Sequence, residues 1–238
     1  MFYLKILSVG IYVVIICIWG ILKGITRWGD TKLGTEFARA YSNFTLKTFG
    51  IEVELEGLEH LNNQPCIYAL NHQSNFDMAT FGLAYPENTV IIGKKELIWI
   101  PFFGLFYKAA GNIMIDRKKI TKAKGSLDQV VEAIKNRKVS VWVFPEGTRN
   151  KSGEGLLPFK KGPFNMAVGA QVPVVPLVCS SMKKAIDWKN KKVLNSKMKL
   201  RILPPIFTTG MTEVDVPLLT EKVRNIMLET VNELNASL

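Results

Sequence analysis

The chain has 238 residues, of which 47% are hydrophobic and 21% charged, and its 18 glycines and 11 prolines are scattered. These values exclude a disordered, collagen-like or low-complexity protein and suit one α/β domain with a large core. A net charge of +11 favours an anionic partner, and a mean hydropathy of +0.12 argues against an ordinary soluble protein. Three widely separated cysteines exclude a disulfide framework and a paired-cysteine metal site, and indicate a reducing compartment: Cys17, Cys66 and Cys179.

Positive charge is concentrated in the middle of the chain. Residues 94–201 carry 23 basic and 7 acidic groups, whereas residues 51–93 carry 6 acidic groups and no basic one. Such a surface attracts nucleic acid, anionic lipid headgroups, phosphorylated substrates and acidic carrier proteins. The sequence contains no paired Cys/His finger, no RNP-like aromatic signature and no basic helix leading into heptads. We therefore expect no nucleic-acid partner, and charge leaves the other three classes open.

The first apolar segment is a candidate membrane helix. Ile6–Leu22 comprises 17 uncharged, mostly apolar residues, which as a helix would span about 25 Å, slightly less than a comfortable bilayer crossing. The segment either crosses the membrane or dips into it. It is long for the apolar part of a cleaved signal peptide, so we expect it to be retained. Basic residues after the segment outnumber those before it, which places the rest of the chain on the cytoplasmic side: Lys5 precedes it, and Lys23, Arg27 and Lys32 follow.

A second helix is predicted over residues 34–50 from apolar side chains at three- and four-residue steps. It either lies on the membrane surface or packs on the following domain, and periodicity alone does not choose between the two. We divide the chain accordingly into membrane-associated helices, residues 1–50, and an α/β domain, residues 51–238. Within the latter, the bulky apolar stretch Leu97–Tyr107 is either core or a lipid-facing wall.

Beyond Gly50, short β-like runs alternate with helical patterns. The alternation of apolar and acidic residues in Ile51–Glu56 predicts an edge strand. Helical patterns lie within residues 123–134 and 163–170 and from Pro217 onward, where Asp215 is a candidate cap. Together these elements predict a mostly parallel or mixed sheet with crossover helices. Five continuous apolar runs predict strands buried on both faces: Cys66–Leu70, Thr89–Ile92, Ile113–Ile115, Val139–Phe144 and Val174–Cys179.

Polar loops follow four of the buried strands. Ligands of parallel α/β sheets bind beyond the carboxyl ends of the strands, so these loops are expected to line one crevice. They are Asn71–Asp77, Gly93–Lys95, Asp116–Arg117 and Pro145–Arg149.

His72 and Asp77 form the candidate catalytic pair. Residues five apart lie about 140° apart on a regular helix, so a turn must separate them if they are in contact. The carboxylate would then hold one imidazole nitrogen protonated and leave the other as a base; a simple polar turn is the alternative. Ser74 lacks the surroundings of a nucleophilic serine, and a loop-capping role is favoured. With no protein nucleophile evident, we expect the base to activate a substrate hydroxyl for direct group transfer.

Candidate anion-binding groups occupy the other loops. Arg149 offers a planar fork for a phosphate, and the backbone of Gly147 allows close approach. Arg117 repeats the fork on another strand, with an ion pair to Asp116 as the alternative. Glu146, beside an arginine, is interpreted as a binding or structural acid. Four lysines are candidates to attract phosphate as point charges, with a water-facing role as the alternative in so basic a region: Lys94, Lys95, Lys160 and Lys161.

These residues fall in four blocks whose order and spacing resemble the glycerolipid acyltransferases, and most closely the bacterial 1-acylglycerol-3-phosphate (lysophosphatidate) acyltransferases. One block alone is modest evidence, whereas four in order behind an apolar N-terminus are specific. The blocks are Asn71-His72-x-Ser74-x-x-Asp77, Gly111-x-x-x-Ile115-Asp116-Arg117, Phe144-Pro145-Glu146-Gly147-Thr148-Arg149 and Val172-Pro173-Val174-Val175-Pro176-Leu177.

The resemblance implies that an acyl group passes from a thioester of coenzyme A or acyl carrier protein to the sn-2 hydroxyl of lysophosphatidate. The product is phosphatidate for phospholipid synthesis, and the family needs no metal and no cofactor beyond the thioester co-substrate. Two alternatives stay open: the same chemistry on another lysolipid, and a membrane lipid-binding protein without catalysis.

The resemblance also assigns roles to residues and a place in the cell. It implies membrane lipids as partners and the cytoplasmic face of the inner membrane as the location. The implied roles are His72 as base, Asp77 as its orienting acid, Arg117 and Arg149 as phosphate ligands, Glu146 and Gly147 as glycerol-positioning residues, and Pro173–Pro176 as support for the acyl chain. Lys95 is a further candidate substrate contact because it lies in the loop after a buried strand.

Overall fold

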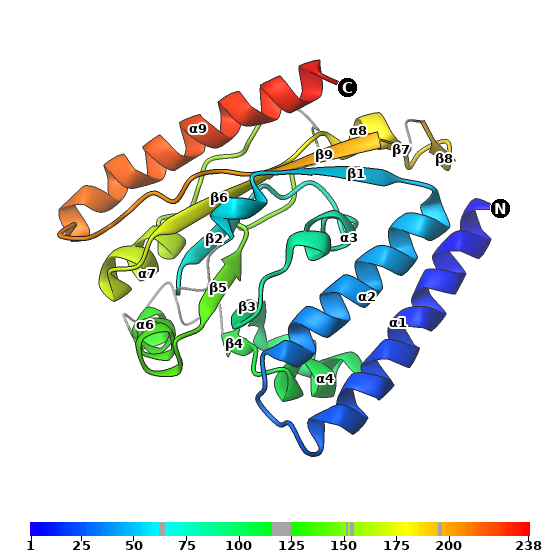
Figure 1. Cartoon of the computed structure of the whole chain (residues 1–238), viewed down its shortest axis with the longest axis horizontal. Coiled ribbons are helices and arrows are strands. Elements are labelled where there is room, and N and C mark those ends of the chain that lie inside the picture. The colour runs from blue at the N-terminus through cyan, green and yellow to red at the C-terminus, as the bar shows by residue number, and fades with distance from the viewer. Residues whose placement is uncertain (62–64, 116–124, 151, 153–154, 195–196) are drawn as a thin grey trace.

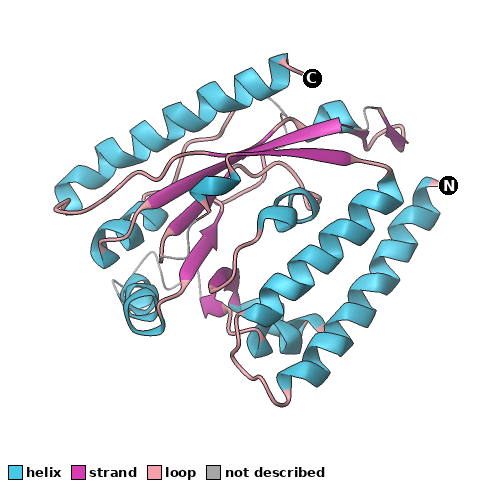
Figure 2. Cartoon of the chain, in the orientation of Figure 1, coloured by secondary structure: helices cyan, strands magenta, loops and turns pink. Residues whose placement is uncertain are grey.

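A sheet of seven strands, counted over the described residues, runs through the centre of the molecule with helices on both faces (Figures 1 and 2). The computed structural model describes residues 1–238 except 62–64, 116–124, 151, 153–154 and 195–196. The strand order is β1-β9-β6-β2-β5-β3-β4. Neighbours from β6 to β4 are parallel, β9 is antiparallel to β6, and β1 is parallel to β9. The predicted mostly parallel or mixed sheet is therefore confirmed.

The strands predicted from apolar runs are all present. Acidic β1 lies at the sheet edge as expected, and its neighbour β9 was not predicted, because its lysines and arginine make it half polar. These charges face the acids of β1 in register, and Arg201 Nε donates to Glu56 Oε2 at 2.6 Å. The bounds are β1 Glu52–Glu56, β2 Ile67–Leu70, β3 Thr89–Lys94, β4 Ile113–Ile115, β5 Ser140–Val143, β6 Val174–Cys179 and β9 Lys197–Ile202, with a separate hairpin of β7 Ile186–Asp187 and β8 Lys192–Val193.

Helices cover the two faces of the sheet unequally (Figure 1). One face carries α6 (Gly125–Arg137), α7 (Gly162–Ala170) and α9 (Val216–Ala236). The other carries α2 (Lys32–Phe49), α3 (Asp77–Phe81) and α8 (Met182–Ala185), with α1 (Phe2–Gly24) outside α2 and α4 (Phe103–Ala109) beside it. Short 3-10 turns complete the described elements: η1 Leu58–His60, η2 Gly82–Ala84, η3 Lys95–Trp99 and η4 Glu213–Asp215.

The start of α9 differs in detail from the prediction. Asp215 is the residue before the helix, as expected, but its side chain does not cap α9. It instead accepts from the backbone N–H of Thr212 at 2.7 Å, and the two residues form a capping box around η4.

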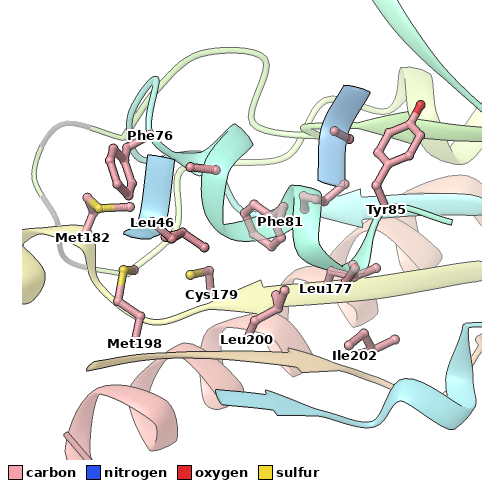
Figure 3. Close-up of a cluster of buried hydrophobic side chains, with 14 of the residues drawn as sticks. Leu46, Phe76, Phe81, Tyr85, Leu177, Cys179, Met182, Met198, Leu200 and Ile202 are labelled. Atoms are coloured by element: carbon pink, nitrogen blue, oxygen red, sulfur yellow. The ribbon is translucent and has the colours of Figure 1, made fainter. Parts of the chain in front are cut away.

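Side-chain alternation along the strands divides the core into two clusters. Ile67 and Ala69 face the cluster under α6, α7 and α9, whereas Tyr68 and Leu70 face the cluster under α2 and α3. Figure 3 shows the second cluster packed between these helices and β6 and β9. Full burial of one large apolar side chain contributes about 1.5–3 kcal/mol, so both faces hold the strands, and hence the loops at their ends, in place.

The N-terminal helices pack on the α/β domain along their length. α2 lies between α1 on one side and α3 and η2 on the other, so the packed-helix alternative is the one observed for it. α1 also contacts α4, and the approach is close: a Cβ added to Gly20 would lie 2.5 Å from the Phe106 ring. The outer side of α1 remains exposed and apolar, and within the described residues α1 is the one helix long and apolar enough to cross a membrane.

The bulky stretch before and within α4 is partly core and partly exposed. Phe106 and Tyr107 are buried, and Phe106 belongs to a small cluster with residues of α1 and α2. Trp99, which is 83% exposed, and Phe102 point away from the core. The stretch therefore supplies exposed apolar side chains as well as core.

Candidate active site

Three neighbouring parallel strands, β6, β2 and β5, bring their carboxyl ends to one edge of the sheet, and hydrogen bonds tie the loops that follow them. Asn71, directly after β2, is buried and pairs with the end of β6: its Nδ2 donates to the Cys179 carbonyl at 3.0 Å, and its Oδ1 accepts from the Cys179 N–H at 2.8 Å. Gln73 donates through Nε2 to the Ser180 carbonyl at 3.0 Å. The residues flanking His72 are thus fastened to a strand more than 100 positions away.

His72 and Asp77 are in contact. His72 Nδ1 lies 2.8 Å from Asp77 Oδ2, and the same oxygen accepts the backbone N–H groups of Gln73 at 2.6 Å and Ser74 at 2.9 Å. A turn separates the pair as predicted, and α3 begins at Asp77. A carboxylate oxygen only accepts hydrogen bonds, so Nδ1 carries the proton and Nε2 is left with its lone pair as a base.

The surroundings of the imidazole fix its plane. The Phe144 ring stacks on it with centroids 4.1 Å apart and an interplanar angle of 23°. The His72 carbonyl accepts from the Asn150 N–H at 2.7 Å, so the loop after β5 holds the backbone of the base as well as its ring. The side chain of His72 stays 22% exposed, against 2% for Asp77. The imidazole is accessible, whereas the carboxyl that it contacts is not.

Ser74 caps the turn and is not placed as a nucleophile. Its Oγ accepts from the Phe76 N–H at 2.9 Å, which confirms the predicted loop-capping role.

Glu146 joins the two catalytic loops. Its Oε1 accepts from the His72 N–H at 2.7 Å, and its Oε2 accepts from the Leu157 N–H at 2.9 Å, with the residue 2% exposed. Burial raises the pKa of this carboxyl above its ordinary value, and the two backbone donors oppose the rise. Glu146 therefore holds the backbone of His72 through its N–H group.

The candidate anion-binding residues lie at the surface. Arg149 is exposed, and its Nη1 donates to Asn75 Oδ1 at 2.7 Å, which keeps it beside the loop of His72. Gly147 adopts φ +70°, a conformation that favours glycine, and is exposed. The Lys160 N–H donates to the Pro145 carbonyl at 2.7 Å, and the Lys160 side chain passes Gly147. Arginine fork, glycine turn and lysine thus gather on one loop pair.

The other predicted cations lie at different distances from the His72 loop or outside the described residues. Lys95 is exposed at the start of η3, beyond β3, which is two strands from β2 in the sheet. Lys160 lies beside the 144–149 loop although it is not part of that loop in the sequence. Arg117 lies outside the described residues.

The cysteine nearest the site is not a nucleophile. Cys179 lies at the end of β6 beside Asn71, and burial raises the pKa of its thiol to about 12, so it is protonated near neutral pH. Among the residues that the structure describes, no three side chains of the His, Cys, Asp and Glu types are grouped as metal ligands would be.

A chain that joins this site to these N-terminal helices has known relatives. The model of the Acyltransferase family matches residues 52–180, which include every described site residue. The 1-acyl-sn-glycerol-3-phosphate acyltransferase of Haemophilus influenzae is 38% identical over 98% of this chain and 95% of its own. The chain belongs to this acyltransferase family. The Escherichia coli enzyme of the same name is 36% identical over 94% of this chain and 91% of its own.

A solved structure shares the fold of this acyltransferase. The crystal structure of the 1-acyl-sn-glycerophosphate (LPA) acyltransferase of Thermotoga maritima superposes with a TM-score of 0.69, at 26% identity, over 87% of this chain and 82% of that one. The similarity therefore extends beyond the catalytic domain into the N-terminal part of the chain.

Sequence reasoning missed three supporting residues of the acyltransferase site. Asn71 and Gln73 fasten the base to β6, and Phe144 stacks on it. The available signal was position: all three are polar or aromatic residues at the carboxyl end of a buried strand. Their partners could not be inferred, because those lie on strands far away in sequence.

Proposed function

We infer that this acyltransferase moves an acyl group from a thioester to the sn-2 hydroxyl of lysophosphatidate and gives phosphatidate for phospholipid synthesis. The observation that carries this function is the His72–Asp77 pair, 2.8 Å apart at the strand-end edge, in a chain 38% identical over 98% of its length to an enzyme of that name.

In the proposed reaction His72 acts as general base. Its Nε2 takes the proton of the sn-2 hydroxyl as the oxygen attacks the thioester carbonyl carbon. A C–O bond forms, the C–S bond breaks, and the imidazolium returns the proton to the departing thiolate. Asp77 keeps Nδ1 protonated and stabilises the imidazolium, so proton transfer is balanced without an acyl-enzyme intermediate. The stacked Phe144 ring limits rotation of the base.

The proposed acceptor contacts lie on the surface side of the base. Arg149 offers a bidentate fork to the phosphate and is kept near His72 by Asn75. Arg117 is proposed as a second fork, and Lys95 as a more distant cation. Glu146 acts by positioning His72, since both its oxygens already accept backbone N–H groups; Gly147 lets the acceptor approach.

The proposed acyl donor is a soluble thioester of coenzyme A or acyl carrier protein. Support comes from the excess of basic residues in 94–201, because both carriers are anionic. The choice between them is left to experiment.

Residues 1–50 are proposed as the membrane-associated part, with residues 51–238 as the catalytic domain. The exposed side of α1 is apolar, and Trp99 and Phe102 extend it near α4. Both ends of α1 touch the domain, through Phe2 on Trp188 and Gly20 beside Phe106. A helix held this way is expected to enter one leaflet without crossing it. The proposed location is the cytoplasmic face of the inner membrane, whose anionic headgroups attract the basic residues that follow α1.

A product assay tests the function. Purified full-length protein receives an acyl thioester with lysophosphatidate, with a lysolipid of another headgroup, or with no acceptor. We expect phosphatidate to form fastest with lysophosphatidate and little free fatty acid without acceptor. Rapid fatty acid release without acceptor would instead make the protein a thioesterase, and equal rates with all acceptors would remove the phosphate-specific assignment.

A further inference from the structure

The β7–β8 hairpin lies beside the start of α1 (Figure 1). The ring of Trp188 meets that of Phe2 edge-on with centroids 5.7 Å apart, and Lys191 Nζ lies 4.7 Å from the centroid of Tyr3. The ring centroids of Trp188 and Phe76, the residue before Asp77, also lie 6.3 Å apart. The hairpin therefore links the apolar N-terminal helix to the loop that carries the catalytic pair.

The hairpin tip has the composition of a membrane–water interface. Trp188 is 44% exposed, and Lys189, Lys191 and Lys192 are all exposed. The acid of the hairpin, Asp187, is occupied by the tip itself, accepting from the Asn190 N–H at 2.9 Å and from its Nδ2 at 2.7 Å. Tryptophan and lysine concentrate at the headgroup level, where apolar rings and stems meet lipid and charges meet phosphate.

We propose that this hairpin is a docking surface for anionic lipid headgroups. The proposal rests on the membrane association of α1 in the proposed function, because the exposed side of α1 sets where the hairpin meets the bilayer. Three lysines complement an anionic leaflet, and the surface is continuous with the exposed apolar residues Tyr3 and Leu4 of α1. An acidic carrier protein would match the charge but not this continuity with an apolar helix. The hairpin thus holds the catalytic edge against the headgroups of its lipid acceptor.

The test compares two charge-matched triple variants of the full chain. The hairpin variant is Lys189→Gln, Lys191→Gln and Lys192→Gln. The control variant is Lys135→Gln, Lys138→Gln and Lys222→Gln, which alters exposed lysines in and after α6 and in α9, on the opposite face of the sheet. Each protein is sedimented at low ionic strength with phosphatidylcholine vesicles, with or without phosphatidylglycerol.

We expect the hairpin variant to lose about tenfold to a hundredfold of its partitioning onto the anionic vesicles, since each lysine near such a surface contributes about fivefold. Partitioning onto neutral vesicles should stay at the wild-type level, and the control variant should change less than about twofold. Added salt should reduce the difference between the two variants.

Three results would overturn the proposal. The first is equal partitioning of the two triple variants onto anionic vesicles. The second is an equal loss by the hairpin variant on neutral vesicles, which would indicate disturbance of α1. The third is unchanged vesicle binding with a raised KM for an acyl carrier protein thioester only, which would make the hairpin a protein-docking surface. Acyl transfer in detergent micelles is measured in parallel: a wild type without transfer but with hairpin-dependent binding would contradict the proposed function alone.

Discussion

The two sides of the active site are built differently. On the base side, Asp77 is buried and bonded to His72 and two backbone N–H groups, and Asn71 ties the same loop to β6. On the anion side, Arg149 and Lys160 lie at the surface. The fold thus holds the proposed proton-transferring pair in place, whereas the proposed phosphate ligands lie on the exposed side of the site. Substitutions on the base side should lower kcat, and those on the anion side should raise KM.

Asp77→Asn should have the largest effect among the supporting residues. An asparagine amide can present a donor to Nδ1, which favours the tautomer with the proton on Nε2 and removes the base. We expect kcat to fall by about a thousandfold or more, while KM for lysophosphatidate changes little. Steady-state rates at saturating thioester measure both, and a loss of kcat below about tenfold would contradict the orienting role.

Asn71→Ala should reduce both stability and turnover. It leaves the buried Cys179 N–H without its side-chain acceptor, whereas the Cys179 carbonyl keeps Gln73 Nε2 at 3.3 Å as a donor. One unsatisfied buried group costs about 1–3 kcal/mol. We expect the free energy of unfolding in urea to fall by at least the cost of one unsatisfied group. We also expect kcat to fall, because the loop of His72 is released. Asn71→Asp, which places a carboxylate oxygen against the Cys179 carbonyl in a fully buried setting, should destabilise the fold at least as much. An unchanged urea midpoint would show that the pairing is unimportant.

Arg149→Ala tests the anion side. Loss of a charge-assisted hydrogen bond to phosphate costs about 1.5–3 kcal/mol, so KM for lysophosphatidate should rise about tenfold to a hundredfold. The decrease in kcat should be smaller, and Arg149→Lys should recover part of the affinity. A fall in kcat at constant KM would place Arg149 on the base side instead and break the contrast between the two.

The smallest effect concerns Glu146 and pH. Burial raises the pKa of this carboxyl above 4.5 in the folded state, so the folded protein holds its proton more tightly than the unfolded chain does. Its contribution to stability is therefore fully present below pH 4.5 and is lost as pH rises through the raised pKa. Wild type should therefore lose unfolding free energy relative to Glu146→Gln as pH rises from about 4 to about 7, as urea unfolding at each pH would measure. A difference independent of pH would contradict the raised pKa.

Local sequence pattern predicted the parts of this fold that depend on local physics. Strands such as β2 and β6 are continuous apolar runs, so their burial on both faces could be predicted from the sequence. β9 was missed because it is an amphipathic strand whose charges are neutralised by β1, a partner 145 residues away. The β7–β8 hairpin was missed because its strands are two residues long.

The same distinction holds for the site. His72 and Asp77 were predicted as a pair because one turn joins them. The clamp of Asn71 on Cys179 spans 108 positions and depends on which strand becomes the neighbour of β2, which periodicity does not reveal. Likewise Lys160 lies beside Gly147 only because residues 155–160 return along the 144–149 loop, whereas Lys95 follows a strand farther along the sheet.

The central claim is that one imidazole removes the proton of the acceptor hydroxyl, and the two histidines of the chain offer a matched test. His72→Ala and His60→Ala are compared in single turnovers with labelled acyl thioester and lysophosphatidate; His60 lies in η1. We predict that His72→Ala forms phosphatidate at least about a thousandfold more slowly than wild type, with lysophosphatidate binding retained, while His60→Ala behaves as wild type. Phosphatidate formation by His72→Ala at a rate near that of His60→Ala would contradict the account.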